Sequence, residues 1–169
     1  MSSSSPAGYR TVSRHDAAEV LVDLSTGHHG LFALRSFQPG DILSDFSAGI
    51  ITATPTYLTV QIGHRRHIAL EPAYLQYLNH SCAPNLRFDL SALQLIVLSP
   101  VAPGDEFCFF YPSTEWKMAQ PFRCHCKSPD CIGEVRGAYS LDQDLLNRHI
   151  LSDHIHRQLT RRVNREKAV

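Results

Sequence analysis

The sequence predicts a mainly β fold of the α+β class, made of several small sheets and completed by a metal-binding loop and a C-terminal helix. Short β-rich runs bounded by turn residues occupy most of residues 20–111. Three cysteines crowd into residues 124–131, and a clear helical pattern occurs only near the C-terminus. A chain of 169 residues, 43% of them hydrophobic, is enough for one well-formed core. We therefore expect one domain with small appendages.

The β-rich runs follow a Ser-rich segment, residues 1–18, which is weakly patterned and predicted to be flexible. Gln38-Pro39-Gly40-Asp41 and Ala102-Pro103-Gly104-Asp105 place proline and glycine where tight turns need a fixed and a permissive φ angle. Strands this short favour small sheets over a doubly wound parallel sheet. The predicted strands are LFAL (31–34), DILSDF (41–46), TYLTVQI (56–62), HIAL (67–70), LQLIVL (93–98) and FCFFY (107–111).

One helix is predicted over residues 141–163, with Ser140 and Gln143 as a capping box at its start. Its apolar residues recur at four-residue steps: Leu151, Ile155, Leu159 and Val163. The basic residues at its end are either a solvated terminus or a partner-binding tail, and we favour the former. The predicted division of the chain is a flexible N-terminus at 1–18, a core at 19–118, a zinc-binding segment at 119–139, and a helix with a basic tail at 140–169.

The charge balance provides no strong field for a polyanionic partner, because sixteen Lys and Arg offset sixteen Asp and Glu. We therefore expect no direct contact with nucleic acid. No apolar run reaches the roughly 20 residues of a membrane span. The start, MSSSSPAG, lacks the basic residues and the apolar middle of a secretory signal. The prediction is a cytoplasmic or nuclear protein that does not bind membranes, in which clustered cysteines are better explained by metal than by disulfides.

The motif Cys-His-Cys at 124–126, followed by Cys131, supplies three thiolates to one loop. Thiolates are soft ligands that favour Zn²⁺, and a structural zinc site needs four ligands. His125 is a poor fourth ligand because both of its neighbours already bind, which leaves Cys82 or Cys108. Cys108 alternates with apolar residues and is better interpreted as a small buried hydrophobe. The predicted zinc ligands are Cys82, Cys124, Cys126 and Cys131.

Three motifs of the sequence match the pattern of one known family. Asn79-His80-Ser81-Cys82-Ala83-Pro84-Asn85 resembles the signature N-H-S-C-x-P-N of SET-domain methyltransferases. Gly104-Asp105-Glu106-Phe107 through Tyr111 resembles the second signature, and the cysteine cluster resembles the post-SET motif C-x-C-x4-C. Gly30-Leu31-Phe32-Ala33, with the later Pro39-Gly40-Asp41, resembles the opening strands. The chain is thus identified as a short member of the SET plus post-SET family over about residues 27–137, which implies a β-clip fold with a knot-like crossing.

The resemblance also implies a reaction and a set of site residues. S-adenosylmethionine would bind on one face, and a target amine would enter from the opposite face through a narrow channel. Tyr111 would be the catalytic residue, and Phe46 and Phe109 would line the substrate channel. Two alternatives stay open: Asn79 and His80 either contact the cofactor or only satisfy backbone groups, and Tyr111 is either catalytic or a core tyrosine. The implied cofactor contacts are His29, Gly30, Leu31, Asn79, His80, Tyr111 and Phe122.

Some features depart from the family pattern on the reacting side. Only about 20 residues separate Val60 from Asn79, so the insert that recognises a peptide substrate is nearly absent. The sequence therefore supports three hypotheses: methylation of a lysine in a protein, chemistry on a small molecule, or a non-catalytic binding module. The substituted positions are His28 for a glycine, Phe46 for a tyrosine, Phe110 for an acid and Gln76 for an arginine.

Overall fold

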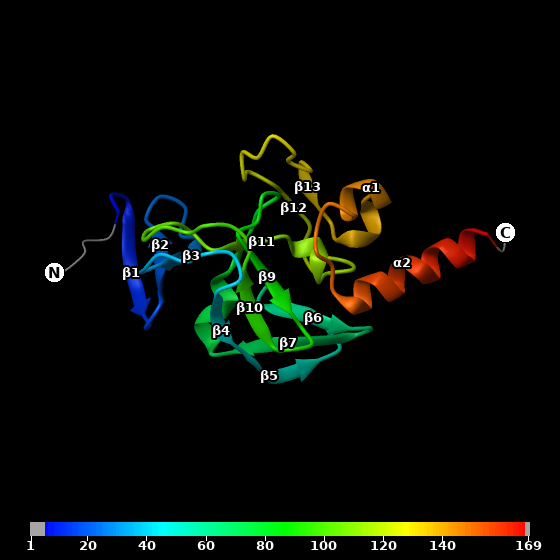
Figure 1. Cartoon of the computed structure of the whole chain (residues 1–169), viewed down its shortest axis with the longest axis horizontal. Coiled ribbons are helices and arrows are strands. Elements are labelled where there is room, and N and C mark those ends of the chain that lie inside the picture. The colour runs from blue at the N-terminus through cyan, green and yellow to red at the C-terminus, as the bar shows by residue number, and fades with distance from the viewer. Residues whose placement is uncertain (1–5, 168–169) are drawn as a thin grey trace.

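Four small β-sheets make up most of the computed structural model, which describes residues 6–167 (Figure 1). The mainly β fold of small sheets is therefore confirmed. Its strands are β1 (Tyr9–Arg14), β2 (Ala18–Asp23), β3 (His29–Ala33), β4 (Ile42–Asp45), β5 (Ser47–Thr52), β6 (Thr59–Gly63), β7 (Arg66–Glu71), β8 (Asn79–His80), β9 (Leu86–Asp89), β10 (Gln94–Val97), β11 (Cys108–Phe109), β12 (Phe122–Arg123) and β13 (Glu134–Val135).

The sheets are joined by short helical turns, and two α-helices follow at the C-terminal side of the molecule (Figure 1). The strand orders are β1-β2-β3, β5-β7-β6, β12-β13 and, in the central sheet, β4-β10-β9-β11-β8. In the central sheet, β11 runs parallel to both β8 and β9. The helical elements are the 3₁₀ turns η1 (Ala73–Tyr77), η2 (Tyr111–Ser113) and η3 (Ala138–Ser140), and the helices α1 (Gln143–Leu146) and α2 (Asp153–Glu166).

Each of the six predicted β-rich runs overlaps a strand, and the two Pro-Gly-Asp turns form as expected. Gly40 and Gly104 adopt φ angles of +93° and +88°, which glycine reaches without strain. In both turns the aspartate closes the loop by accepting a backbone N–H, from Gln38 to Asp41 at 2.7 Å and from Ala102 to Asp105 at 2.8 Å. The motif therefore builds the same turn twice.

The N-terminal segment, residues 1–18, was predicted to be flexible, but the structure differs from this prediction. Residues 1–5 lie outside the described part of the chain, but β1 occupies Tyr9–Arg14 and pairs antiparallel with β2. Its residues alternate between half-buried and exposed, as in an edge strand with one face on the core. The half-buried face carries Tyr9, Thr11 and Ser13, and the exposed face carries Val12 between two arginines, so the sequence holds no clear hydrophobic alternation here.

The prediction of one helix over residues 141–163 is also wrong, because α1 ends at Leu146 and α2 begins at Asp153. Tertiary contacts interrupt the helix: the ring of His149 stacks on Phe110 at 3.7 Å, and the Ser152 N–H donates to the Ser113 carbonyl. The residue that caps α1 is Asp142, whose side chain accepts from the Leu145 N–H, instead of Ser140.

Two apolar cores meet at Phe110 and Tyr111. The larger core lies among the three main sheets and includes Phe107 and Phe109. The second core packs the C-terminal helices against Phe110 through Leu146, Leu151, Ile155 and Leu159, whereas Val163 is 38% exposed. The segment containing the second signature is therefore held from both sides. Across residues 6–167, the helices are too short or too polar to cross a membrane.

Candidate functional site

The two signature motifs lie side by side at the centre of the molecule. β8 and β11 pair in parallel, which places Asn79 beside Cys108 and His80 beside Phe109. Asn85 ties the two motifs together, because its side chain donates to the Glu106 carbonyl at 2.8 Å and accepts the Cys108 N–H at 2.9 Å. Residues 20 or more positions apart in sequence thus form one wall.

Asn79 uses its amide group to join this wall to β3. Its Nδ2 donates to the His29 carbonyl at 2.8 Å and to Oε1 of Glu106 at 2.7 Å. A Cβ atom at position 30 would lie 2.5 Å from that same carboxylate oxygen, so a larger residue there would displace the Glu106 side chain. Burial raises the pKa of Glu106, and the Asn79 hydrogen bond opposes the shift.

His80 connects the wall formed by β8 and β11 to the cysteine cluster. Its Nδ1 accepts the Tyr111 N–H at 3.1 Å, so Nε2 carries the proton of the neutral ring and faces Sγ of Cys82 at 3.3 Å. Burial lowers the pKa of His80 to about 4, with a smaller contribution from His149. At neutral pH His80 is therefore an uncharged donor to the Cys82 sulfur.

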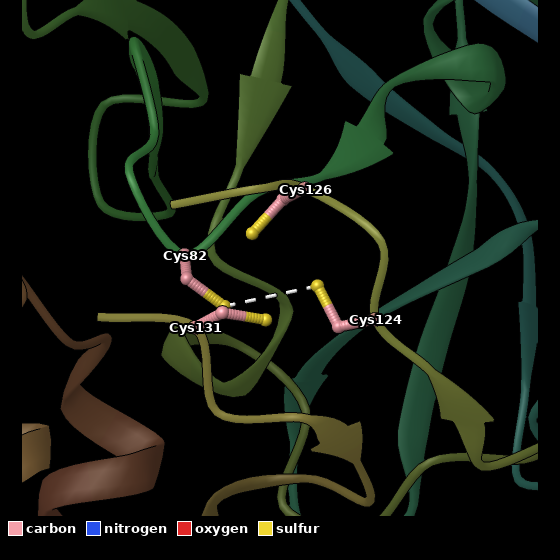
Figure 2. A group of neighbouring side chains, drawn as sticks. All are labelled: Cys82, Cys124, Cys126 and Cys131. Atoms are coloured by element: carbon pink, nitrogen blue, oxygen red, sulfur yellow. Dashed lines mark hydrogen bonds between the residues drawn. The ribbon is translucent and has the colours of Figure 1, made fainter. Parts of the chain in front are cut away.

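Figure 2 shows the sulfur atoms of Cys82, Cys124, Cys126 and Cys131 turned toward a common point, where all four lie within 4.8 Å of one another. A tetrahedral Zn²⁺ with Zn–S bonds of about 2.3 Å would separate its sulfurs by about 3.8 Å. The Cys82 and Cys124 sulfurs are 3.8 Å apart. The Ile132 N–H also points at Sγ of Cys82 at 3.5 Å, as expected around a thiolate. This donor set could hold a metal ion.

The same geometry separates Cys82 from the other candidate ligands. Cys108 and His125 lie outside this group of four. Cys108 is half-buried in β11, where burial raises the pKa of its thiol to about 12. His125 is exposed between its two cysteine neighbours. The cluster therefore joins the loop after β12 to the turn after β8, 42 residues earlier.

A cleft of about 1070 Å³ runs past these elements. The residues that line it include His29, Asn79, His80 and Phe122, and also Val60, Leu70, Phe109, Tyr111 and Glu115. The structure thus brings most of the predicted cofactor and channel residues to one cavity. His28 also lines the cleft, but its side chain is exposed.

Three of the predicted cofactor and channel residues do not line the cleft, and one of them is Gly30, which is buried in β3. Leu31 is fully buried in the main core, and Phe46 is 4% exposed and packs edge-to-face on Phe88 at 5.4 Å. Neither lines the cleft, because Leu31 in β3 and Phe46 between β4 and β5 both pack in the apolar core. Phe88 reaches the cleft instead, next to Phe109 at 4.8 Å.

Tyr111 closes the floor of the cleft. Its ring packs against Phe109 at 4.7 Å, and its hydroxyl donates to the Leu78 carbonyl at 2.9 Å. Burial is the main reason that the pKa of this hydroxyl is raised, and nearby Cys108, Glu106 and Glu115 add to the effect. Tyr111 is therefore a neutral hydroxyl with a fixed direction.

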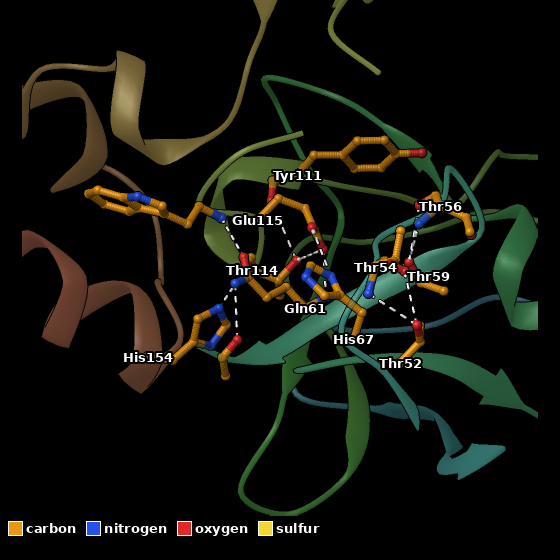
Figure 3. Close-up of polar contacts among 12 residues, drawn as sticks. Thr52, Thr54, Thr56, Thr59, Gln61, His67, Tyr111, Thr114, Glu115 and His154 are labelled. Atoms are coloured by element: carbon orange, nitrogen blue, oxygen red, sulfur yellow. Dashed lines mark hydrogen bonds and ion pairs between the residues drawn. The ribbon is translucent and has the colours of Figure 1, made fainter. Parts of the chain in front are cut away.

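Sequence reasoning missed a buried polar group beside Tyr111 (Figure 3). Glu115 accepts the Gln61 N–H at 2.7 Å, and His154 contacts the Thr114 carbonyl through Nε2 at 2.6 Å. Burial raises the pKa of Glu115 to about 7, against the opposing hydrogen bonds from Gln61 and Thr114. The one signal available was an acid four residues after Tyr111, in an aromatic stretch.

The family model of the SET domain matches residues 28–112, which is half of the chain. Methyltransferase flvH of Aspergillus flavus is 39% identical over 125 residues, which cover 73% of this chain and 70% of the relative. The chain belongs to the SET-domain family of methyltransferases. This SET domain also matches a crystal structure of a Plasmodium falciparum protein named as a histone methyltransferase, with 15% identity, a TM-score of 0.41, and coverage of 58% of this chain and 95% of that one.

The boundaries of the family match divide the cysteine cluster. Of the four clustered cysteines, Cys82 lies inside the SET domain match and the other three follow it. The match also ends at residue 112, one residue after Tyr111 and before Glu115 and Phe122. Part of the cleft of this SET domain is therefore built by segments that the family model leaves out.

Proposed function

We propose that this SET domain transfers a methyl group from S-adenosylmethionine to a primary amine, with the side chain of a protein lysine as the first candidate. The observation that carries the proposal is the continuous cleft, which joins the wall of Asn79 and His80 to the aromatic floor of Phe109 and Tyr111. A donor held at one end would face an amine that enters from the other.

The residues at the first end suit a nucleoside bearing an amino acid. Phe122 is 37% exposed and packs edge-on to His80 and Tyr111 at 6.0 and 5.9 Å, so it offers an aromatic cover for a base. The His29 backbone and the Glu106 carboxylate supply polar groups at the same wall. A cleft of about 1070 Å³ has ample room for a ligand of this size.

The chain's own residues would act mainly by position. S-adenosylmethionine supplies an electrophilic methyl group on a sulfonium. Tyr111 and the Leu78 carbonyl present oxygen atoms that can orient an amine and accept weak hydrogen bonds from a polarised methyl group. Phe88 and Phe109 keep the amine's alkyl chain out of water. No covalent step on the protein is needed.

A free small-molecule amine is the second candidate substrate, and one observation favours it. Between Val60 and Asn79 the chain forms only the end of β6, β7 and η1, so this stretch contributes no further element that would extend a groove for a polypeptide. The exposed Tyr57 beside the cleft offers a single aromatic contact in its place.

The metal that we propose for the cysteine cluster is Zn²⁺, on the evidence of four thiols and the 3.8 Å sulfur separation. Its role would be structural, because a site with four protein ligands leaves no open position for a substrate. It would hold Phe122 and His80 in the same cleft wall.

Two measurements test the proposed function. Isothermal titration with S-adenosylmethionine and S-adenosylhomocysteine should show saturable binding, and its absence would refute the methyltransferase proposal. Radiolabelled methyl transfer to lysine peptide arrays and to a panel of free primary amines then separates the two substrate classes. Tyr111→Phe should abolish transfer while it preserves S-adenosylhomocysteine binding; a fully active variant would remove Tyr111 from the mechanism.

A further inference from the structure

A buried carboxylate lies at the substrate end of the cleft, with one of its two oxygens uncommitted. Glu115 is 6% exposed and lines the cleft. Its Oε1 accepts the Gln61 N–H at 2.7 Å, with the Thr114 hydroxyl at 3.4 Å. Its Oε2 faces Nδ1 of His67 at 3.9 Å, which is too long for a hydrogen bond. Oε2 therefore has room for a further donor.

His67 is incomplete in the same place. It is 5% exposed, and its Nδ1 is the one buried side-chain nitrogen or oxygen in residues 6–167 that lacks a hydrogen-bond partner. Buried polar groups are nearly always satisfied, so an unpaired one calls for a specific explanation. Figure 3 shows Glu115 between Tyr111 and His67. The two incomplete atoms thus face each other beside the cleft.

Glu115 is also close to the proposed reacting centre. Its N–H donates to the Tyr111 carbonyl at 2.9 Å, one helical turn earlier. Val60, Leu70 and Phe109 also line this cleft and provide apolar walls. An amine enters such a channel as an ammonium ion at neutral pH, and it must lose a proton before its lone pair can attack a methyl group.

We propose that Glu115, positioned by Gln61 and His67, is the proton acceptor for the substrate ammonium. The proposal rests on the methyl transfer to an amine proposed above. One N–H bond of the ammonium breaks and an O–H bond forms at Oε2, directly or through one water molecule. The electron pair stays on nitrogen and then bonds to the methyl carbon. The proton leaves Glu115 through the open cleft after the methylated product departs.

The charge state of this site fits the role. Burial raises the pKa of Glu115 to about 7, so its carboxylate is a stronger base than an exposed one. The pKa of His67 is lowered by burial, which keeps its ring neutral. The other titratable groups packed around Glu115 are Tyr111 of η2 and, beyond Thr114, His154 of α2. Of these four groups, Glu115 is the acid that ionises near neutral pH.

The test uses n-butylamine, which reproduces the lysine side chain and also represents a free amine. Single-turnover methylation with saturating S-adenosylmethionine is followed by mass spectrometry between pH 6 and pH 10. The wild-type rate should rise to about pH 7 and then level. Glu115→Gln should be about 100-fold slower at pH 7.5 and should gain tenfold per pH unit, approaching wild type near the amine's pKa of about 10.

Matched variants separate this role from a structural one. Glu134→Gln, at an exposed glutamate paired with Arg136, should match the wild type at every pH. Glu115→Asp keeps a carboxylate and should keep the levelled profile at a lower rate. The proposal would be overturned if the methylation rate of Glu115→Gln were lower than that of the wild type by the same factor at all pH values, or were not lower at all. Unchanged S-adenosylhomocysteine binding in Glu115→Gln shows that the cofactor site is intact, so a failure of the Glu115 proposal is distinguishable from a failure of the proposed function.

A second readout needs no turnover. Infrared difference spectra of wild type minus Glu115→Gln isolate the Glu115 carboxyl band in the S-adenosylhomocysteine complex. Addition of n-butylammonium near pH 7 should shift this band and its titration midpoint. If neither the band position nor its titration midpoint changes on addition of n-butylammonium, while S-adenosylhomocysteine binds normally, Glu115 does not contact the amine and its proposed role is refuted.

Discussion

His154 allows the coupling between the C-terminal helix and the core to be measured through pH. It is 3% exposed, and its Nε2 contacts the Thr114 carbonyl at 2.6 Å. Burial lowers its pKa from 6.5 to about 4, and the Thr114 carbonyl opposes the shift. When the pKa of a histidine is lower in the folded state than in the unfolded state, its contribution to stability is fully present at pH values above the unfolded-state pKa. The protein loses this stability as the pH falls toward the folded-state pKa. The affected window is therefore pH 6.5 down to pH 4.

The shift from 6.5 to about 4 predicts that acidification destabilises the fold by about 2 kcal/mol at pH 5 and about 3 kcal/mol at pH 4. His154→Gln keeps a donor for Thr114 but cannot titrate. In urea unfolding, the free energy of unfolding of the wild type should be higher than that of this variant at pH 7.5. The difference between the two free energies should fall by about 2 kcal/mol at pH 5. The cysteine cluster is the same in both proteins, so its pH dependence cancels in this difference. A difference that stays constant from pH 7.5 to pH 5 would refute the reasoning.

Three further predictions concern the cleft wall. Gly30→Ala should displace Glu106 and weaken S-adenosylhomocysteine binding at least tenfold by titration, and unchanged affinity would show that the wall adapts. Tyr111→Phe removes the hydrogen bond to Leu78 and should lower the free energy of unfolding by about 1 kcal/mol in urea, whereas a stabilised variant would contradict its satisfied hydroxyl. Cys126→Ser should release bound zinc, measured by mass spectrometry, and destabilise the protein by several kcal/mol. Cys108→Ser is its control, and equal zinc loss in both would disprove the assigned ligands.

The parts of the site that could be predicted were those in which function imposes a local pattern. The run from Asn79 to Asn85 contains side chains that hydrogen-bond to neighbouring segments, and it also contains Cys82 of the cysteine cluster. Both roles are therefore visible in seven consecutive residues. Cys82 was separable from Cys108 because a polar turn differs from an apolar strand in sequence. The turns around Gly40 and Gly104 were predictable for the same local reason.

The parts that could not be predicted depend on contacts between distant segments. Glu115 acquires its buried environment from Gln61, which lies 54 residues away, and no local pattern records that approach. The break between α1 and α2 has a similar cause, since residues 147–152 carry neither glycine nor proline. The helix stops because His149 and Ser152 find partners at Phe110 and Ser113. Phe46 looked like a channel residue, but its neighbours direct it into the core.

The position of Cys82 at the junction of two motifs has a consequence for how the protein is synthesised. Its sulfur partners, Cys124, Cys126 and Cys131, emerge from the ribosome some 40 residues later, and the helices that cover Phe110 come later still. A shortened chain that stopped at residue 112, where the SET match ends, would expose Phe110 and leave Cys82 without its thiol partners. Such a fragment is expected to aggregate, because the unit that folds extends at least to Leu159.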